Sequence, residues 1–401
     1  MEYSKTLAAQ ILREIQPSKS PNWAWCYCFV PALIGYFLIL MHYVNEKPPV
    51  GNLVSLHPDF YKLIGEGTKI EMVTKDILFS EGPLWINDEQ TSASYLLFSD
   101  IPRNRIYRWE EGKGPFTIGK SVQIDKSGCY SNTTRCELLR QPGSNALILF
   151  ADTNAIDLVV CQHGERSIAI FYENGTRFHL ATHYHGRPLN SPNDVVWSRY
   201  GDLYFTDPYY GLLSKAKDGK GNSLEVLDKH IPYSGIYMIK REAIQYAVEN
   251  NIPTNEVILL SSELSHPNGL AFSIDHKKLY VANSSPDDQE KYWSVFDVLE
   301  DGSLANKKIF FNASELITEK RIGTPDGMKV DKKGNLFASA PGGVVIISST
   351  GKLLGRLFLP EFQVSNVAFG DDGYLYLTTA DSVLRVKTLT KPSKAHKFYF
   401  K

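Results

Sequence analysis

Ser191-Pro192-Asn193-Asp194-Val195-Val196-Trp197 is a short apolar strand preceded by a carboxamide, and a Gly-Asp turn leads from it to Leu203-Tyr204-Phe205-Thr206. The same order of oxygen-bearing side chain, apolar strand, turn and second apolar strand recurs four more times. The other copies begin at Ser80-Glu81-Gly82-Pro83-Leu84, His266-Pro267-Asn268-Gly269-Leu270, Thr324-Pro325-Asp326-Gly327-Met328 and Ser365-Asn366-Val367. At one equivalent position every copy carries an oxygen donor: Glu81, Asn193, Asn268, Asp326 and Asn366.

This recurrence predicts a β-propeller. Each repeat is a small antiparallel sheet that cannot bury its own faces, so the copies have to stack against one another. Repeats of about 40 residues made only of strands and turns are typical of propeller blades. Further apolar strands between Ala146 and Phe171 bring the number of blades to six. We therefore expect an all-β, six-bladed propeller over residues 61–401, with Phe60 to Val73 supplying a strand that closes the ring.

The equivalent oxygen donors indicate a metal site. In a propeller the first strand of each blade lines the central channel, so these side chains should converge on one axis. Buried together without a cation, they would repel one another or lack hydrogen-bond partners. A mixed set of carboxylate and carboxamide oxygens favours Ca²⁺, and Zn²⁺ stays open as an alternative. The simpler explanation is that these Asn and Asp residues only cap turns. Turn capping readily explains such a residue in one repeat, but it explains less well an oxygen donor at the same position of five repeats.

The N-terminal part differs in composition from the repeats. Residues 1–22 are polar, whereas residues 23–44 form an apolar run without Asp, Glu, Lys or Arg. As a helix this run would span about 33 Å, which matches the hydrocarbon core of a bilayer. We therefore expect a polar tail at 1–22, a transmembrane anchor at 23–44 and a linker at 45–60. A cleaved signal peptide and a buried globular helix are the alternatives.

Charge, sequons and cysteines bear on the compartment. The formal net charge of −1 gives no support for nucleic-acid binding. Three basic residues precede the apolar run and two follow it closely, which favours a cytoplasmic N-terminus and a lumenal or extracellular propeller. Cys129 and Cys136 could pair in such a compartment, whereas Cys161 ends an apolar strand and should be buried. Four N-glycosylation sequons agree with this orientation: Asn132, Asn174, Asn283 and Asn312.

The repeat motifs resemble those of the SMP-30/gluconolactonase/LRE-like family, also called the regucalcin-like family. The similarity covers roughly residues 70–390, and the motifs occur in the family's order. The resemblance implies a six-bladed propeller with one divalent metal on its axis, and lactone hydrolysis as the reaction. A membrane anchor is not usual in the family, so substrate and compartment stay open. The metal ligands that the resemblance implies are Glu81, Asn193, Asn268 and Asp326.

Lactone hydrolysis needs a polarised carbonyl and an activated water. Asp326 could bind the metal and also accept a proton from the water, and His163 is the second candidate base because it follows a strand of the second blade. The alternative for His163 is a packed, hydrogen-bonded loop histidine. His185 and Arg187 precede the Asn193 motif and are candidates for substrate binding, although exposed loop positions are the simpler explanation for both.

Other mechanisms receive no support from the sequence, which lacks a Gly-x-Ser-x-Gly elbow, a Walker A motif and a Rossmann fingerprint. We therefore expect a metal-dependent lactonase, held at a membrane by its N-terminal helix, with a small-molecule lactone as its partner. Two alternatives stay open. One is an esterase, arylesterase or biosynthetic enzyme on the same propeller, and the other is a non-catalytic, metal-stabilised binding propeller.

Overall fold

The computed structural model describes residues 50–113, 116–117, 119–150, 155–217, 224–317 and 322–393. The predicted polar tail and transmembrane anchor lie outside these residues. Within them, no helix combines the length and the apolar character that crossing a membrane would require.

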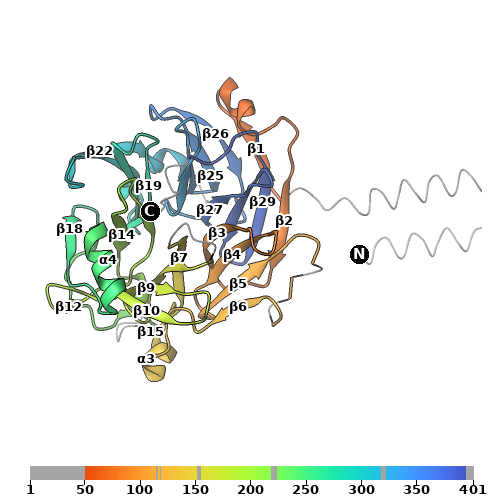
Figure 1. Cartoon of the computed structure of the whole chain (residues 1–401). Helices are drawn as coiled ribbons and strands as arrows, with labels where there is room; N and C mark the ends of the chain where they lie inside the picture. The colour runs from red at the N-terminus through yellow and green to blue at the C-terminus, as the bar shows by residue number, and fades with distance from the viewer. Residues whose placement is uncertain are drawn as a thin grey trace, which may run out of the picture. The chain divides into compact units, whose positions relative to one another are not determined.

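Six antiparallel sheets surround a central axis, as predicted (Figure 1). The first three blades have these strands, from the axis outward: β3 (Ser80–Asp88), β4 (Ala93–Asp100), β5 (Arg105–Trp109) and β6 (Val122–Asp125); β7 (Ser144–Leu149), β8 (Leu158–Gln162), β9 (Ser167–Phe171) and β10 (Arg177–Ala181); β13 (Val195–Trp197), β14 (Leu203–Asp207), β17 (Gly235–Ile239) and β18 (Val257–Ser261). The other three have these: β19 (Pro267–Phe272), β20 (Lys278–Ser284), β21 (Lys291–Val298) and β22 (Leu304–Asn312); β23 (Met328–Val330), β24 (Leu336–Ala340), β25 (Gly343–Ile347) and β26 (Leu353–Phe358); β27 (Val364–Phe369), β28 (Tyr374–Thr379) and β29 (Ser382–Lys387).

The ring is closed by a strand from the N-terminal side of the propeller. β2 (Ile70–Lys75) pairs with β29 in antiparallel register, with Ile70 opposite Val386, and so completes the sixth blade. This confirms the predicted closing strand, although its first predicted residue, Phe60, lies in the 3-10 helix η1 (Pro58–Lys62) instead.

The predicted linker at 45–60 is wrong for its second half. β1 (Asn52–Ser55) pairs with β26 and adds a fifth strand to the fifth blade, with Asn52 opposite Phe358. Phe60 is fully buried among residues of the fifth and sixth blades. The prolines of this segment indicated a linker. The edge strand β26, however, has unpaired backbone donors and acceptors, and an extended segment beside it can form hydrogen bonds with them.

Short elements connect the blades. The α-helices among the described residues are α3 (Thr133–Leu138) and α4 (Arg241–Asn250), and α4 ends where Asn251 adopts a left-handed conformation with φ of 53°. Two hairpins are each formed by two short strands, β11 (His183–Tyr184) with β12 (Arg187–Pro188) and β15 (Leu213–Lys217) with β16 (Leu224–Val226). The remaining elements are η2 (Tyr210–Leu212), η3 (Asp288–Glu290) and η4 (Ala313–Leu316).

The hydrophobic core lies between the blades because each sheet packs both faces against its neighbours. Trp197 of β13 illustrates this arrangement. Its ring is buried against apolar residues of the second blade, and its indole N–H donates to the carbonyl of Leu149 at 2.9 Å. β25 is buried along its whole length, which explains why its sequence of Gly-Val-Val-Ile-Ile does not alternate with polar residues.

Candidate active site on the propeller axis

The first residues of the innermost strands form a ring around the axis. Hydrogen bonds join neighbouring blades at this level, among them Ala146 N to Asn193 O (3.1 Å), Leu270 N to Asp194 Oδ2 (3.2 Å), Gly327 N to Ser365 O (2.7 Å) and Asn366 Nδ2 to Glu81 Oε2 (3.0 Å).

Glycine allows the first and second blades, and the fourth and fifth, to approach closely. A Cβ atom on Gly82 would lie 2.1 Å from the carbonyl oxygen of Asn145, and one on Gly269 would lie 2.3 Å from that of Asp326. Both distances are far inside van der Waals contact, so these positions accept only glycine without movement of the backbone. The glycine that follows the oxygen donor in three repeats therefore has a packing role, and the ring brings together all the predicted metal ligands.

Glu81 is buried in this ring with a relative exposure of 3 %. Its carboxylate accepts hydrogen bonds from the backbone N–H of Gly82 at 2.7 Å and from the side chain of Asn366 at 3.0 Å. Burial raises the pKa of Glu81 to about 7, although both hydrogen bonds act in the opposite direction. The negative charge of Asp194 raises this pKa further.

Two more carboxylates share the axis with Glu81. Burial, followed by the charges of Glu81 and Asp194, raises the pKa of Asp326 well above its usual range, while Asn268 donates a hydrogen bond that lowers it. Burial also raises the pKa of Asp194, whose oxygens accept from the backbone N–H groups of Val195 and Leu270. Three carboxylates are thus held together in surroundings that disfavour a negative charge on each.

The predicted ligand set omits three side chains that the ring includes. Asn145, which is 4 % exposed, holds the equivalent position in the second blade. Asp194, the residue after Asn193, is 4 % exposed, and its Oδ2 accepts a hydrogen bond from the N–H of Leu270 in the next blade. Tyr210, from η2, has a hydrogen bond to Asn268, and the charge of Asp326 contributes to raising its pKa. Ser144-Asn145 matches Ser365-Asn366 of the sixth blade, which is the signal that could have identified Asn145 from the sequence.

His163 lies beside the ring and is fully buried. Its Nδ1 is 3.2 Å from the carbonyl of Gln141 and its Nε2 is 3.4 Å from the side-chain nitrogen of Asn145. Burial lowers the pKa of His163 to about 4. An imidazole with this pKa is a weak base near neutral pH, so these contacts favour positioning of Asn145, and the predicted role as a proton acceptor stays a prediction.

Three rings form a wall beside the carboxylates. The hydroxyl of Tyr209 lies 2.9 Å from Nε2 of His266, and the ring of His266 stacks on that of Tyr210 at 5.9 Å between centroids. The Nδ1 atom of His266 is buried and has no hydrogen-bond partner among the described residues. An unpaired buried nitrogen costs roughly 1–3 kcal/mol. A ligand or a water at this wall would remove that cost.

The predicted substrate-binding residues lie on the hairpin of β11 and β12. His185 occupies its tip with φ of 48°, and Arg187 is the first residue of β12. Both are exposed. Buried Arg166 fixes the base of this hairpin, because its guanidinium donates to the carbonyls of Pro188 and Leu189. Substrate binding by His185 and Arg187 stays a prediction.

The four sequons differ in accessibility. Asn132 and Asn174 are exposed, and Asn312 is half-buried at the start of η4. Asn283 is fully buried in β20, where its side chain donates to the carbonyl of Glu290 at 2.7 Å and accepts from the backbone N–H of His266 at 2.9 Å. The prediction of a glycan at Asn283 is therefore wrong for the folded protein, because this carboxamide is enclosed and fully used.

Cys129 and Cys136, whose pairing the sequence left open, form a disulfide, and Cys161 is buried with a free thiol, as expected. The bonded loop packs against the segment that carries His163. A Cβ atom on Gly164 would lie 2.3 Å from Sγ of Cys129. The N–H of Glu165 donates to the carbonyl of Gly128 at 2.8 Å. The disulfide therefore supports the loop on which His163 depends.

We expect the double substitution of Cys129 and Cys136 by serine to lower the free energy of unfolding by about 2–3 kcal/mol, because the disulfide closes a short loop in the unfolded chain. Urea unfolding of the full chain measures this effect. Dithiothreitol should destabilise the wild type by a similar amount and leave the double variant unchanged. Equal stability of wild type and variant would show that the loop holds without the bond.

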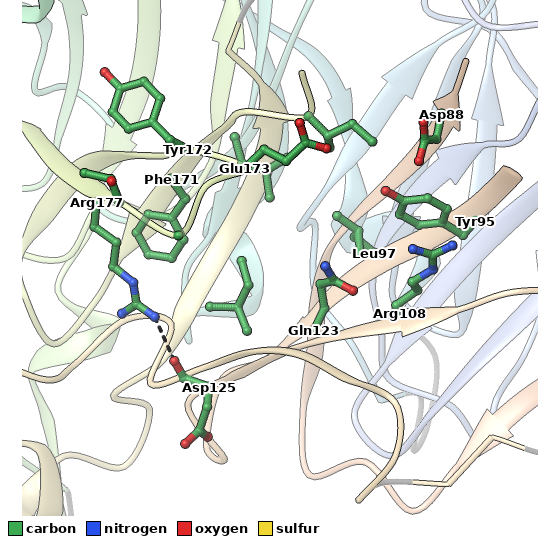
Figure 2. Close-up of a pocket in the computed structure, with 15 residues that line it drawn as sticks. Asp88, Tyr95, Leu97, Arg108, Gln123, Asp125, Phe171, Tyr172, Glu173 and Arg177 are labelled. Carbon is green, nitrogen blue, oxygen red and sulfur yellow. Dashed lines mark hydrogen bonds between the residues drawn. The ribbon is translucent and has the colours of Figure 1, made fainter. Parts of the chain in front are cut away.

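A cavity of about 500 Å³ lies elsewhere, between the first and second blades (Figure 2). The guanidinium of Arg108 stacks on Tyr95 at 3.6 Å, and that of Arg177 stacks on Phe171 at 4.7 Å. The cavity reaches Asp88, which is at the opposite end of β3 from Glu81. A strand of this length separates them by about 20 Å. This cavity is therefore not the site formed by the axial ring.

The chemistry of the axial ring suits a divalent cation. The ring combines carboxylate and carboxamide oxygens, burial raises the pKa of Glu81, Asp194 and Asp326, and repulsion from neighbouring carboxylates raises those of Glu81 and Asp326 further. A cation among them would favour the charged forms. An all-oxygen set of this kind suits hard ions such as Ca²⁺.

The fold and the ring together define a six-bladed propeller with an oxygen-donor site at its centre. Comparison with known proteins identifies the family. Residues 79–381 match the family model of the SMP-30/Gluconolactonase/LRE-like region. The chain therefore belongs to the SMP-30/gluconolactonase/LRE-like family.

The relatives include bacterial and archaeal proteins. A gluconolactonase from Zymomonas mobilis subsp. mobilis is 33% identical over 349 residues, which cover 85% of this chain and 87% of that protein. The pentonolactonase XacC from Haloferax volcanii is 25% identical over 78% of this chain and 85% of its own length. The solved structure of a gluconolactonase from Xanthomonas campestris superposes with a TM-score of 0.63 at 25% identity, covering 85% of this chain and 97% of that one.

Proposed function

We propose that the chain is a metal-dependent hydrolase that opens a lactone at the axial ring. One observation carries the proposal: Glu81, Asp194 and Asp326 are held together at the axis although burial disfavours the charge on each. Selection for stability alone would replace such carboxylates by neutral residues. The similarity to a gluconolactonase and a pentonolactonase supports a cyclic ester as the substrate.

Glu81, Asn193, Asn268 and Asp326 would hold the ion, and the oxygen-only donor set favours Ca²⁺ over Zn²⁺. When bound, a divalent cation would polarise the carbonyl group of the lactone. Asn366 and the backbone N–H of Gly82 orient the carboxylate of Glu81 by donating hydrogen bonds to it.

Asp326 would act as the base. Its carboxylate belongs to the axial ring and is half-buried, whereas Glu81 and Asp194 are buried, so it is the most accessible of the three carboxylates to a water. As the oxygen of a water bonds to the lactone carbonyl carbon, Asp326 takes a proton from that water. The ring C–O bond then breaks, and the proton passes to the departing oxygen to give a hydroxy acid. Tyr209, Tyr210 and His266 would exclude bulk water on one side.

We further propose that the propeller faces an oxidising compartment, with the apolar run at 23–44 as its membrane anchor. The disulfide of Cys129 and Cys136 and the exposed sequons at Asn132 and Asn174 support this orientation. Digestion of the native protein with peptide N-glycosidase F, followed by mass spectrometry, tests it. A glycan on either residue is expected, and unmodified asparagine at both sites would contradict the proposal.

Hydrolysis of a small substrate panel by pH-stat tests the function. The panel includes an aldonic 1,5-lactone, a 1,4-pentonolactone and phenyl acetate, and each substrate is assayed with the full chain, with EDTA, and with Ca²⁺ or Zn²⁺ added back. We expect lactone hydrolysis that EDTA abolishes and Ca²⁺ restores. Activity indifferent to EDTA would contradict the metal mechanism. Faster turnover of phenyl acetate would indicate an esterase, and ion binding without turnover would indicate a binding propeller.

A further inference from the structure

A lysine projects into the central channel just beyond the carboxylates. Lys329 is the middle residue of β23, between the buried side chains of Met328 and Val330. The positions in the same register on the innermost strands of the third and fourth blades are apolar, namely Val196 and Ala271. These three side chains line one small cavity of about 50 Å³. A cation is therefore placed in a part of the channel whose other walls are apolar except at Ser393.

The ammonium group is connected to the carboxylates through one carboxamide. Nζ of Lys329 donates to the carbonyl of Met328 at 3.1 Å and lies 3.5 Å from Oδ1 of Asn366. The Nδ2 atom of Asn366 donates in turn to Glu81. The positive charge of Lys329 lowers the pKa of Glu81 and of Asp194, against the dominant effect of burial. Lys329 thus acts electrostatically on the ring.

The charges of the channel can be counted. Glu81, Asp194 and Asp326 contribute three negative charges when ionised, and Lys329 contributes one positive charge, which leaves a net charge of minus two. One divalent cation would neutralise this site. A trivalent ion, or a second cation beside Lys329, would leave a buried excess of positive charge, which a low-dielectric channel disfavours.

We propose that Lys329 is a built-in counter-cation that sets the charge of the axial site so that it accepts one divalent ion, in preference to a trivalent ion or a second cation. This inference rests on the metal site of the proposed function. It assigns to Lys329 a role in ion selectivity that is separate from any contact with substrate.

Ion binding by neutral variants of Lys329 tests the proposal. Calcium binding to the full chain is measured by isothermal titration calorimetry, and Tb³⁺ binding by luminescence, for wild type, Lys329→Met and Lys329→Gln. Lys329→Gln keeps a donor for Met328 O and Asn366, so it serves if the methionine variant folds poorly. Two variants serve as controls. Lys329→Arg keeps the positive charge in the channel, and Lys333→Met removes a positive charge from an exposed position of the same blade.

Both neutral variants should bind Ca²⁺ on the order of tenfold more tightly than wild type. Because the electrostatic energy scales with the charge of the ion, Tb³⁺ affinity should rise by about thirtyfold. Lys329→Arg and Lys333→Met should match wild type. Unchanged or weaker binding in both neutral variants overturns the role of Lys329. Absence of binding to wild type overturns the metal site itself, and lost hydrolysis with intact ion binding is a failure of the proposed reaction alone.

Discussion

Replacing Asp326 by asparagine should reduce kcat/KM for lactone hydrolysis by about a thousandfold or more while the propeller stays folded. The substitution keeps the size of the side chain but removes a negative charge from the ring and removes the proposed base. Loss of a metal's electrophilic contribution amounts to several kcal/mol, which is on the order of a thousandfold in rate. Hydrolysis by pH-stat measures the loss, and calorimetric titration should show weaker Ca²⁺ binding in the same variant.

Asp76→Asn is a matched control, because Asp76 is exposed and asparagine tolerates its backbone φ of 68°. This variant should retain full activity. Thermal unfolding in EDTA separates folding from ion binding: removal of one of three repelling carboxylates should leave Asp326→Asn at least as stable as wild type. Near-normal hydrolysis by Asp326→Asn would remove Asp326 from the mechanism, and a large drop in stability would make it a structural residue.

Much of the fold could be predicted because the sequence of each repeat specifies its own strands and turn. The motif around Asn193 encodes a strand, a turn and a second strand, and five copies in register leave few ways to bury their faces other than a ring. Closure by β2 followed from the same reasoning, because the sixth blade would otherwise lack an outer strand. The convergence of Glu81, Asn193, Asn268 and Asp326 also followed from the ring.

The rest of the site depends on positions that only the closed ring defines. Asn145 lacks the Pro or Gly neighbour that marks most of the other copies and shares only its Ser-Asn pair with Asn366, so its equivalence is clear only from its contact with Gly82. Lys329 reads in the sequence as an ordinary polar residue of a short strand. Its direction into the channel depends on how β23 sits against the sixth blade, where Asn366 accepts its hydrogen bond.

Burial explains the predictions that failed. A sequon specifies three residues and carries no information about exposure, and Asn283 lies on an inner strand of the fourth blade where its carboxamide is needed by the chain. The residues of β1 resemble a linker because their own sequence carries no information about β26, the strand with which they pair. The second error arises because the partner strand of β1 lies near the other end of the propeller sequence.

His163→Gln should make the protein less sensitive to acid. Burial lowers the pKa of His163 to about 4, whereas an unfolded histidine titrates near 6.5. Between these values the unfolded chain binds a proton that the folded protein does not, so stability present above pH 6.5 is lost as the pH falls toward 4. The difference corresponds to about 3 kcal/mol. Urea unfolding at pH 7.5 and pH 4.5 measures it as the change in free energy between the two conditions.

The comparison between variant and wild type matters because other groups act in the opposite direction. Burial raises the pKa of Asp207 to about 7, so its contribution falls as the pH rises. Subtracting the two proteins' profiles cancels that contribution. His230→Gln, at an exposed histidine, should keep the wild-type profile. Equal acid sensitivity in His163→Gln and wild type would show that the buried imidazole of His163 accepts a proton in the folded state.

Hydrolysis by His163→Gln separates the two chemical roles of His163. If His163 is a base, kcat at neutral pH should fall by about a hundredfold or more, whereas if His163 only positions Asn145, the variant should retain most of its kcat.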